Sequence, residues 1–465
     1  MFIGRADELR FLEEKYCSPG GQLVVLYGRR RVGKTETLRK FCEGKEHVFY
    51  TCTEIPDALQ LVAFSDRVLQ KGFPAAQYIR SFPEWTQALG SIAELPAMGK
   101  KLLIIDEFPY MVKGNPSIPS ILQKLWDEGF KDKDVMIILC GSAMSFIEDE
   151  VLAEKNPLYG RATAILKMNE MSFFEAIQFL PNYDAADLIT AFAVLGGIPH
   201  YLKQFDDSLT IGENICRSIL YRGSILYNET EFLMRQELRE TAIYNAIIEA
   251  VALSNTKLGD IHQKTQVEKT KLSAYLKNLV NLSILRREFP VIGSVKEQAN
   301  VQRGLYQVTD NFFRFWFAFV FPSLSELETG DAHGIWKHIV EPSIDAYTSR
   351  VFEDVCRQYL RLLNRRSALP FYFTKIGRWW DKVSEVDIMA TDSSKRHFLL
   401  GKCKYRKTAV ALSDYKALCE KFKPDAPNGK VFYCLFSKSG FSDEMINAAK
   451  AEDVMLATAE EVVRG

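Results

Sequence analysis

A glycine-rich segment that ends in a lysine and a threonine has the clearest chemistry in this sequence. It reads GRRRVGKT from position 28 and directly follows the apolar run QLVVLY at 22–27. Glycines let such a loop wrap so that backbone N–H groups point at phosphate oxygens, and a following helix adds the positive end of its dipole. Lys34 is expected to reach the β- and γ-phosphates of a nucleotide, and Thr35 to ligate Mg²⁺. The alternative is a chance glycine turn, but the order of strand, complete motif and helix favours a Walker A loop. The residues expected to bind the nucleotide here are Gly28, Arg29, Arg30, Arg31, Val32, Gly33, Lys34, Thr35 and Glu36.

A second apolar run ends in two acids. The segment KKLLIIDEF covers 100–108 and places Asp106 and Glu107 at the carboxyl end of a predicted parallel strand, where ligands bind in open α/β sheets. Asp106 is expected to hold Mg²⁺, directly or through water. Glu107 is expected to orient and deprotonate an attacking water. The alternative is a strand that simply ends in solvated acids.

Two further polar residues follow predicted strands or precede one. Ser142 ends the run DVMIILCGSAMS at 134–145, where it either senses a γ-phosphate or caps the next helix. Arg161 lies just before another strand-like run in NPLYGRATAILKM. It either supplies positive charge to a transition state, in cis or from a neighbouring protomer, or forms an ordinary salt bridge.

Length and composition limit the classes of protein. The 465 residues are too many for one core and predict about three domains. The formal net charge of zero excludes a wholly basic nucleic-acid coat but leaves room for a local basic face. Nine scattered cysteines suit reduced thiols. The N-terminus has no signal pattern, and the most apolar stretch, Phe312 to Pro322, is too short to span a bilayer. We therefore expect a cytoplasmic protein without membrane contact.

Together these segments resemble the archaeal-type ATPase family, a group related to AAA+ and STAND-class ATPases. The resemblance rests on FIGRADEL at the N-terminus, the GRRRVGKT and LLIIDEF motifs, the GSAMSF and PLYGR segments, and AFAVLGGIPHYL at 191–202. It implies ATP as the nucleotide, with Mg²⁺, and makes Arg161 a sensor or trans-acting arginine. It also implies that a glycine-proline motif closes a lid behind the nucleotide, although a helix ended by a Gly-Gly turn is the alternative. The residues involved are Ile3, Gly4 and Arg5 near the base, and Gly196, Gly197 and Pro199 in the motif.

The middle of the chain is expected to be a winged helix-turn-helix. A helical stretch at 229–252 precedes a short helix, a longer helix and two strands. The buried face of the longer helix is expected to carry Leu272, Tyr275, Leu276 and Leu279. In that fold the second helix can enter a DNA major groove while the wing touches the backbone. The alternative is an intramolecular joint with ordinary solvated charges. The side chains expected to contact phosphates are Lys264, Lys269, Lys271, Lys277, Arg286 and Arg287.

The C-terminal region is expected to resemble a restriction-endonuclease-like fold, as the family's extension does. Asp310 is followed by the aromatic run NFFRFWFAFVF, and then by a helix, strands at 371–376, 384–391 and 397–405, another helix and a last strand. Active members of that fold bind Mg²⁺ through an aspartate and an acid-x-lysine motif. Here lysine stands where the acid should be and would repel the metal, so nuclease activity is not expected. An ion-paired structural cluster is the simple alternative. The residues of this degenerate site are Glu353, Glu385, Asp387, Lys402 and Lys404.

These patterns predict a multidomain α/β protein. The expected domains are an ATPase core at 1–170, a helical lid at 171–235, a winged helix at 236–310 and the endonuclease-like domain at 311–465. The favoured function is an ATP-hydrolysing switch that recognises double-stranded DNA or another nucleic acid, with a homo-oligomer left open. A switch that binds only protein, or an ATP-regulated nuclease, are the alternatives.

Overall fold

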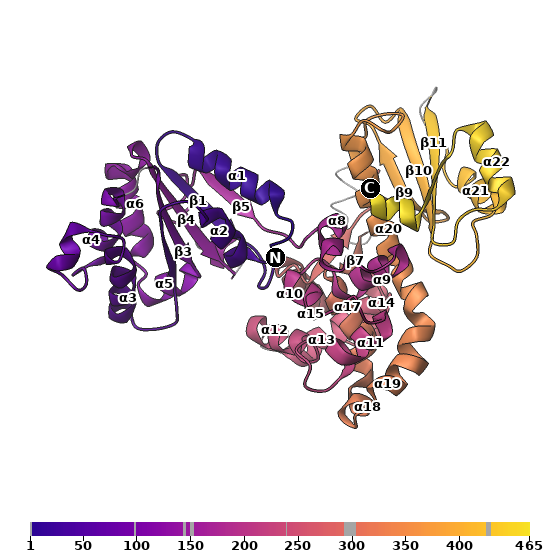
Figure 1. Cartoon of the computed structure of the whole chain (residues 1–465). Helices are drawn as coiled ribbons and strands as arrows, with labels where there is room; N and C mark the ends of the chain where they lie inside the picture. The colour runs from indigo at the N-terminus through magenta and orange to yellow at the C-terminus, as the bar shows by residue number, and fades with distance from the viewer. Residues whose placement is uncertain are drawn as a thin grey trace. The chain divides into compact units, whose positions relative to one another are not determined.

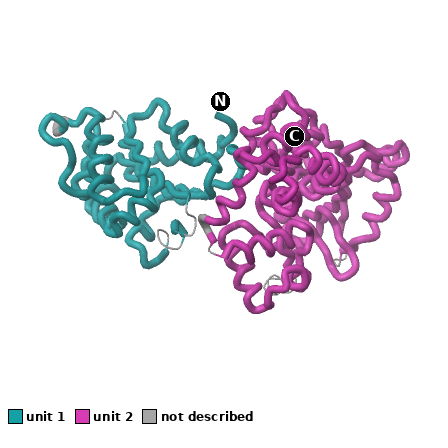
Figure 2. The backbone as a smooth tube through the Cα atoms, turned by 90° about the horizontal axis from the view of Figure 1, so that it is seen from below, with its two compact units in different colours: residues 1–171, 198–200 teal, residues 172–197, 201–465 magenta. Residues whose placement is uncertain are grey.

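The computed structural model describes residues 2–96, 99–142, 146–148, 153–238, 240–292, 304–424 and 429–465. Two compact units make up the chain (Figure 2). Unit 1 comprises residues 1–171 with 198–200, and unit 2 comprises 172–197 with 201–465. Each unit has its own buried hydrophobic cluster.

Unit 1 is built on a five-stranded sheet in which every neighbouring pair is parallel. In spatial order the strands are β2 (His47–Thr51), β3 (Lys101–Asp106), β4 (Val135–Gly141), β1 (Gln22–Tyr27) and β5 (Ala164–Lys167). All residues of β1 and β4 are buried, as expected for central strands covered on both faces. The parallel sheet predicted for the N-terminal region is confirmed.

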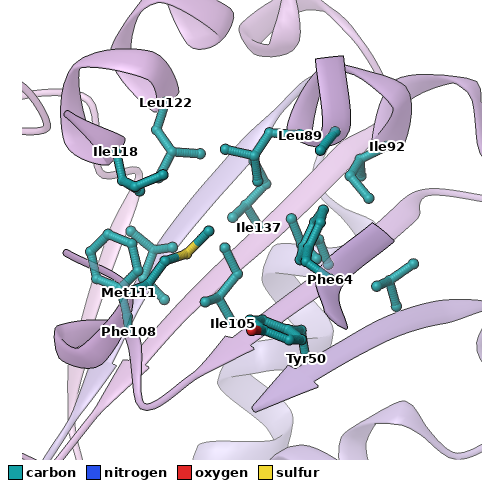
Figure 3. Close-up of a cluster of buried hydrophobic side chains, with 14 of the residues drawn as sticks. Tyr50, Phe64, Leu89, Ile92, Ile105, Phe108, Met111, Ile118, Leu122 and Ile137 are labelled. Atoms are coloured by element: carbon teal, nitrogen blue, oxygen red, sulfur yellow. The ribbon is translucent and has the colours of Figure 1, made fainter. Parts of the chain in front are cut away.

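Helices cover this sheet, and their apolar side chains form the core of the unit. Figure 3 shows Phe64, Leu89, Met111 and Leu122, one from each of four successive helices, gathered with strand residues in one cluster. These helices are α3 (Asp57–Leu69), α4 (Trp85–Gly90), α5 (Phe108–Gly114) and α6 (Ile118–Glu128). Helices α1 (Ala6–Cys17) and α2 (Lys34–Cys42) pack against each other. The remaining short 3₁₀ helices are η1 (Pro74–Gln77), η2 (Ser91–Glu94) and η3 (Phe130–Asp132).

The first half of unit 2 is mainly helical. The helix expected over 229–252 is divided into α12 (Glu229–Glu237) and α13 (Thr241–Ala252), because Leu238 takes an extended conformation and buries its side chain. The order helix, helix, two antiparallel strands is present as predicted, with α14 (Leu258–Thr265) and α15 (Lys269–Asn281) before β6 (Leu285–Glu288) and β7 (Leu305–Val308). The earlier elements are α8 (Phe173–Ala176), η5 (Ile177–Phe179), α9 (Ala185–Leu195), α10 (Pro199–Leu202), α11 (Ile211–Ile215) and η6 (Cys216–Leu220).

The aromatic segment after β7 lies in the core. Asp310 caps α17 (Asn311–Phe315) by accepting hydrogen bonds from Phe312 N and Phe313 N at 2.7 and 3.1 Å. Most side chains of α17 and of the following η7 (Trp316–Val320) are buried, which agrees with a core role. Four elements follow: η8 (Phe321–Ser323), α18 (Leu324–Glu328), α19 (Ala332–Ile335) and η9 (Trp336–Val340).

The C-terminal part begins with the 25-residue helix α20 (Glu341–Arg365) and continues with a mixed sheet. The sheet order is β12-β11-β10-β9-β8, and β10, β11 and β12 are parallel while β8, β9 and β10 are antiparallel. The first strand was predicted at 371–376 but runs from Lys375 to Trp380, since the preceding residues form no ladder. The elements are β8 (Lys375–Trp380), β9 (Glu385–Thr391), β10 (His397–Lys404), α21 (Leu412–Cys419), β11 (Lys430–Ser437), α22 (Asp443–Glu452), β12 (Met455–Thr458) and α23 (Ala459–Arg464).

Long apolar helices are not found in the described part of the chain. None of its helices combines the length and hydropathy that a membrane span needs.

Candidate functional site

The Walker A loop joins β1 to α2 at the carboxyl edge of the sheet. Gly28 lies so close to the next segment that a Cβ atom at this position would overlap the Met168 carbonyl oxygen. Gly33 has a φ of 95°, in the left-handed region that favours glycine. Both glycines therefore allow the loop to follow this path, which brings backbone N–H groups to the start of α2.

The lysine and threonine of the motif are held at the same edge. Lys34 is buried, and its Nζ donates hydrogen bonds to the carbonyl oxygens of Gly28 and Arg29, each at 2.9 Å. The Thr35 hydroxyl donates to Asp106 Oδ2 at 2.8 Å. The two residues predicted to share a metal are thus neighbours, although they lie 71 positions apart in sequence.

Strand order explains a contact that the sequence analysis did not predict. Because β4 lies between β1 and β3, the residue that follows β4 is placed between the Walker A loop and the acids after β3. Ser142 Oγ donates a hydrogen bond to Glu107 Oε2 at 2.9 Å. The serine is therefore hydrogen-bonded to the carboxylate that is proposed to activate the attacking water. The helix-capping alternative involves residues 143–145, which lie outside the described residues.

Burial sets the electrostatics of the site. It lowers the pKa of Lys34, and the nearby Cys140, Glu107 and Asp106 oppose this shift. Burial, followed by the charge of Asp106, raises the pKa of Cys140 well above its usual value, so the thiol stays protonated. Cys140 is a site neighbour that sequence reasoning missed, and its only signal is its place two residues before Ser142.

The N-terminal segment is attached to the loop. Arg5 is buried, with a φ of 63°, and its guanidinium donates to Val32 O at 2.7 Å and to Glu8 Oε1 at 2.8 Å. Gly4 precedes it with a φ of 69°. This arrangement places the Ile3-Gly4-Arg5 segment beside the Walker A loop, so Arg5 fixes the loop and its contact with the base remains a prediction.

The other arginines and Glu36 lie around the loop. Arg29 is partly buried, whereas Arg30, Arg31 and Glu36 are exposed. The charge of Arg30 also lowers the pKa of Lys34, by less than burial does, whereas Cys140, Glu107 and Asp106 raise it. A loop rich in arginine therefore adds positive potential next to the expected phosphate positions.

The glycine-proline motif also reaches this loop. Helix α9 ends at Gly196, which has a φ of 66°, so the helix-terminating alternative is present in the structure. Residues 198–200 nevertheless belong to unit 1, while their neighbours on both sides belong to unit 2. A Cβ atom at Gly33 would lie 3.8 Å from Pro199 Cγ, which puts the proline in van der Waals range of the loop.

Comparison with known proteins agrees with this geometry. Residues 2–205 match a family model described as an ATPase domain predominantly from Archaea. An uncharacterized protein of Methanocaldococcus jannaschii is 33% identical over 408 residues, which cover 87% of this chain and 88% of that protein. The chain belongs to the archaeal-type ATPase family. It is therefore an ATP-binding ATPase, as the resemblance implied.

Two further matches extend the comparison. An uncharacterized ATP-binding protein of M. jannaschii is 52% identical over 46 residues, 10% of the ATPase and 78% of that protein. A Walker-type ATPase of Pyrococcus abyssi has a similar fold, with a TM-score of 0.52 and 19% identity over 68% of the ATPase and 96% of that chain. Residues 316–416 match a model of archaeal and bacterial proteins of unknown function.

Arg161 lies at the amino end of the strands of this sheet, whereas the Walker A loop lies at their carboxyl end. Thr163 pairs with Leu23 at the start of β1, through hydrogen bonds of 2.8 and 3.0 Å. From Leu23 to Gly28 the strand spans about 16 Å at roughly 3.3 Å per residue. Arg161 forms a two-pronged ion pair with Asp127, at 3.0 and 2.8 Å. This position does not support action in cis, whereas action on a neighbouring protomer remains a prediction.

The lysines expected to contact nucleic acid are all exposed. Leu272, Leu276 and Leu279 bury one face of α15, which turns the opposite face to solvent. Tyr275, predicted on the buried face, is only partly buried and donates a hydrogen bond to Glu240 Oε2 at 2.5 Å. The exposed cations are Lys264, Lys269, Lys271 and Lys277.

The two arginines predicted to lie on a wing make contacts within the ATPase. Arg286 donates to Gln307 Oε1 at 3.2 Å and lies 3.7 Å from Asp354 Oδ2. The guanidinium of Arg287 stacks over the rings of Phe289 and Tyr306, at 4.8 and 5.6 Å from their centroids. Phosphate groups would therefore have to compete with the partners that these arginines already have. The lysines of α15 are the more accessible charges.

Among the residues predicted to form a degenerate nuclease site, Asp387 and Lys402 form an ion pair. Lys402 Nζ lies 2.9 Å from Asp387 Oδ1, and the Cys403 backbone N–H donates to Asp387 Oδ2 at 2.9 Å. Both oxygens of the buried aspartate are therefore engaged. The described residues contain no group of three or more His, Cys, Asp or Glu side chains able to hold a metal ion.

The remaining residues of this cluster have separate partners. Lys404 was grouped with Asp387 in the sequence analysis, but it lies 3.3 Å from Asp414 Oδ1 on α21. Glu385 forms an ion pair with Arg378, which also lies 3.6 Å from Glu353 Oε2. Burial, and then the charge of Asp387, raises the pKa of Glu353 to about 7. Glu353, Glu385 and Asp387 thus each lie beside a cationic side chain.

Proposed function

We propose that this ATPase is a nucleotide-driven switch that binds nucleic acid through a winged helix. In this proposal Mg·ATP binds at the Walker A loop, hydrolysis resets the bound state, and the glycine-proline motif carries the change to unit 2. The exposed lysine face of α15 is the observation that supports the proposal most strongly.

The residues present fit a Mg²⁺ ion. Thr35 Oγ1 and Asp106 Oδ2 are 2.8 Å apart, and hydroxyl and carboxylate oxygens are the ligands that Mg²⁺ prefers. We infer that these two residues hold the ion, which would neutralise charge on the β- and γ-phosphates. Lys34 would leave its carbonyl partners to contact the phosphates. Glu107 would take a proton from the attacking water, and Ser142 would keep the carboxylate in place.

The chain path supports coupling between nucleotide and the rest of the molecule. Three residues around Pro199 pack with unit 1, and the chain on either side belongs to unit 2. A shift of the Walker A loop on loss of the γ-phosphate would therefore be transmitted through residues 198–200 to α9 and to the chain after Tyr201. Chain segments that move, or that change between order and disorder, when the γ-phosphate is released are a common switching device.

The charge of α15 supports nucleic acid as the partner. The helix carries three lysines and no acidic residue, and all three lysines are exposed. A helix in this position of a winged-helix fold can enter a major groove. Its lysines would contact phosphates as point charges, so affinity should fall steeply with salt.

Replacing Lys269, Lys271 and Lys277 together by glutamine tests this surface. Each lost phosphate contact removes roughly 0.9 from the slope of log K against log salt, so the triple variant should lose up to ~3 from the slope. Binding to a labelled duplex, measured by anisotropy at several salt concentrations, gives this slope.

The control is a second triple variant on unit 1, with glutamine at Lys113, Lys124 and Lys133, which are also exposed. It should keep the wild-type slope. Equal loss in both variants would show that only general charge matters, and an unchanged slope in the α15 variant would remove this helix as the binding surface. A wild-type protein that binds no duplex would direct the search to a protein partner.

A further inference from the structure

A partly buried arginine on α20, Arg350, has one buried N–H group without a hydrogen-bond partner among the described residues. Within the described part of the chain, Arg350 Nη2 is buried and donates no hydrogen bond. The neighbouring Arg357 instead donates to Asp387 O at 3.1 Å and pairs with Asp354. Buried polar groups are nearly always paired, so an unpaired guanidinium calls for an explanation.

The helical spacing of α20 places Arg350 between two other arginines. Tyr347, Arg350 and Glu353 recur at three-residue steps and share one face of the helix. The Arg314 guanidinium lies 4.1 Å from the centroid of the Tyr347 ring and donates to Tyr347 O at 2.8 Å. Arg378 Nε lies 3.6 Å from Glu353 Oε2. Guanidinium groups from α17, α20 and β8 therefore meet along this face.

All three arginines have a buried N–H without a hydrogen-bond partner among the described residues. These are the Nε atoms of Arg314 and Arg378 and the Nη2 atom of Arg350. The three side chains come from three different elements. They form an incomplete set of donors, and one ligand with several acceptor oxygens would complete it.

The three guanidinium groups repel one another, and the acids that face them are Glu288, Glu353 and Glu385. Burial, then the charges of Arg378 and Arg314, lowers the pKa of Arg350 to about 10, although Glu288 and Glu353 oppose the shift. Glu288 already pairs with Arg378 at 3.2 Å. Because its pKa is raised to about 7 by burial and Asp387, Glu353 is only partly ionised at neutral pH. An added anion would offset the repulsion among the three guanidinium groups.

We propose that Arg314, Arg350 and Arg378 form a binding site for a phosphate oxyanion. A tetrahedral phosphate presents several oxygens to donors that arrive from different directions, and arginine is well suited to phosphate recognition. The site belongs to unit 2, whereas the Walker A loop belongs to unit 1. It is also distinct from the lysine face of α15, so it goes beyond the function proposed above. Its ligand is either free phosphate or a phosphodiester of nucleic acid.

Thermal unfolding with and without phosphate tests the site in the full chain. The Glu107→Gln protein is kept saturated with Mg·ATP throughout, so that the Walker A loop is occupied. Inorganic phosphate is then compared with chloride at equal ionic strength. A ligand that binds only the folded state stabilises it in proportion to the logarithm of its concentration. We expect the unfolding midpoint to rise by a few degrees in phosphate, and the rise to disappear with Arg350→Gln.

A control variant on the same helix is Arg365→Gln, because Arg365 is exposed in the last turn of α20. It should keep the phosphate-dependent rise. In chloride alone, Arg350→Gln should unfold at the same temperature as its parent or higher, since an unpaired buried charge is removed. A rise of equal size in the parent and in Arg350→Gln, or no rise in either, would overturn the proposal.

The source of the phosphate is distinguished by duplex binding. If the site serves nucleic acid, Arg350→Gln should reduce the salt slope for duplex binding by about 1. If it serves free phosphate, the slope should be unchanged while phosphate stabilisation is lost. Loss of neither would contradict an anion site at Arg350, whether or not α15 binds nucleic acid.

Discussion

Replacing Glu107 by glutamine should lower the kcat of ATP hydrolysis by about 10²- to 10⁴-fold and change the Kd for ATP little. The carboxylate is the proposed general base, and glutamine keeps its shape but accepts no proton. Ser142 Oγ now donates to Glu107 at 2.9 Å and can donate equally to an amide oxygen. Glu107 has a φ of 53° at the start of α5, and the isosteric change leaves this local backbone undisturbed. Phosphate release and nucleotide binding, measured separately, check the two parts of the expectation.

The control for this variant is Glu46→Gln. Glu46 is exposed and lies just before β2, at the amino edge of the sheet, so its kcat should equal that of the wild type. If Glu107→Gln kept more than a tenth of wild-type kcat, another group would have to activate the water. If it failed to bind ATP, the carboxylate would have a role in binding that the geometry does not indicate.

Replacing Lys34 by methionine should have an effect of similar size through a different step. Removal of one preorganised donor at a reacting oxyanion costs about 10²–10³ in kcat, and Lys34 is also expected to contact the β- and γ-phosphates in the ground state. We therefore expect a large fall in kcat together with weaker ATP binding. Steady-state ATPase assays and nucleotide titration measure both.

Stability distinguishes this effect from misfolding. Burial lowers the pKa of Lys34 in the folded protein, so the charged form is less favourable folded than unfolded, and this cost is present at pH values where the lysine is charged. Methionine removes the cost and keeps the length of the side chain. The nucleotide-free Lys34→Met protein should unfold at the same temperature as the wild type or above it. A clearly lower unfolding temperature would attribute lost activity to the fold.

The parts of the site that follow local motifs were predictable from sequence. Lys34 and Thr35 come from one continuous loop, and Asp106 ends a strand whose apolar run is unmistakable. What local pattern does not give is the order of strands in the sheet. That order places Ser142 against Glu107. Arg161 lies at the amino end of the strands because it precedes β5, which pairs in parallel with β1. Both outcomes depend on pairing between distant segments.

Errors in unit 2 have the same origin. The sequence around Leu238 contains no helix breaker, and its extended conformation comes with the burial of its side chain. Lys402 and Lys404 lie two positions apart on one strand and so share a face, which predicts a single cluster with Asp387. Helix α21, however, brings Asp414 to Lys404. Arg350 carried no signal at all. Its significance depends on Arg314 and Arg378, which arrive from other elements.

Duplex binding by the Glu107→Gln protein, with and without Mg·ATP at two salt concentrations, tests the central proposal most directly. This variant should hold ATP without hydrolysing it. We expect binding that depends on Mg·ATP and weakens at the higher salt concentration, because in the proposed switch the nucleotide state controls a surface whose lysines would contact phosphates. Binding that is the same with and without ATP would contradict the switch, and no binding in either state would contradict a nucleic-acid partner.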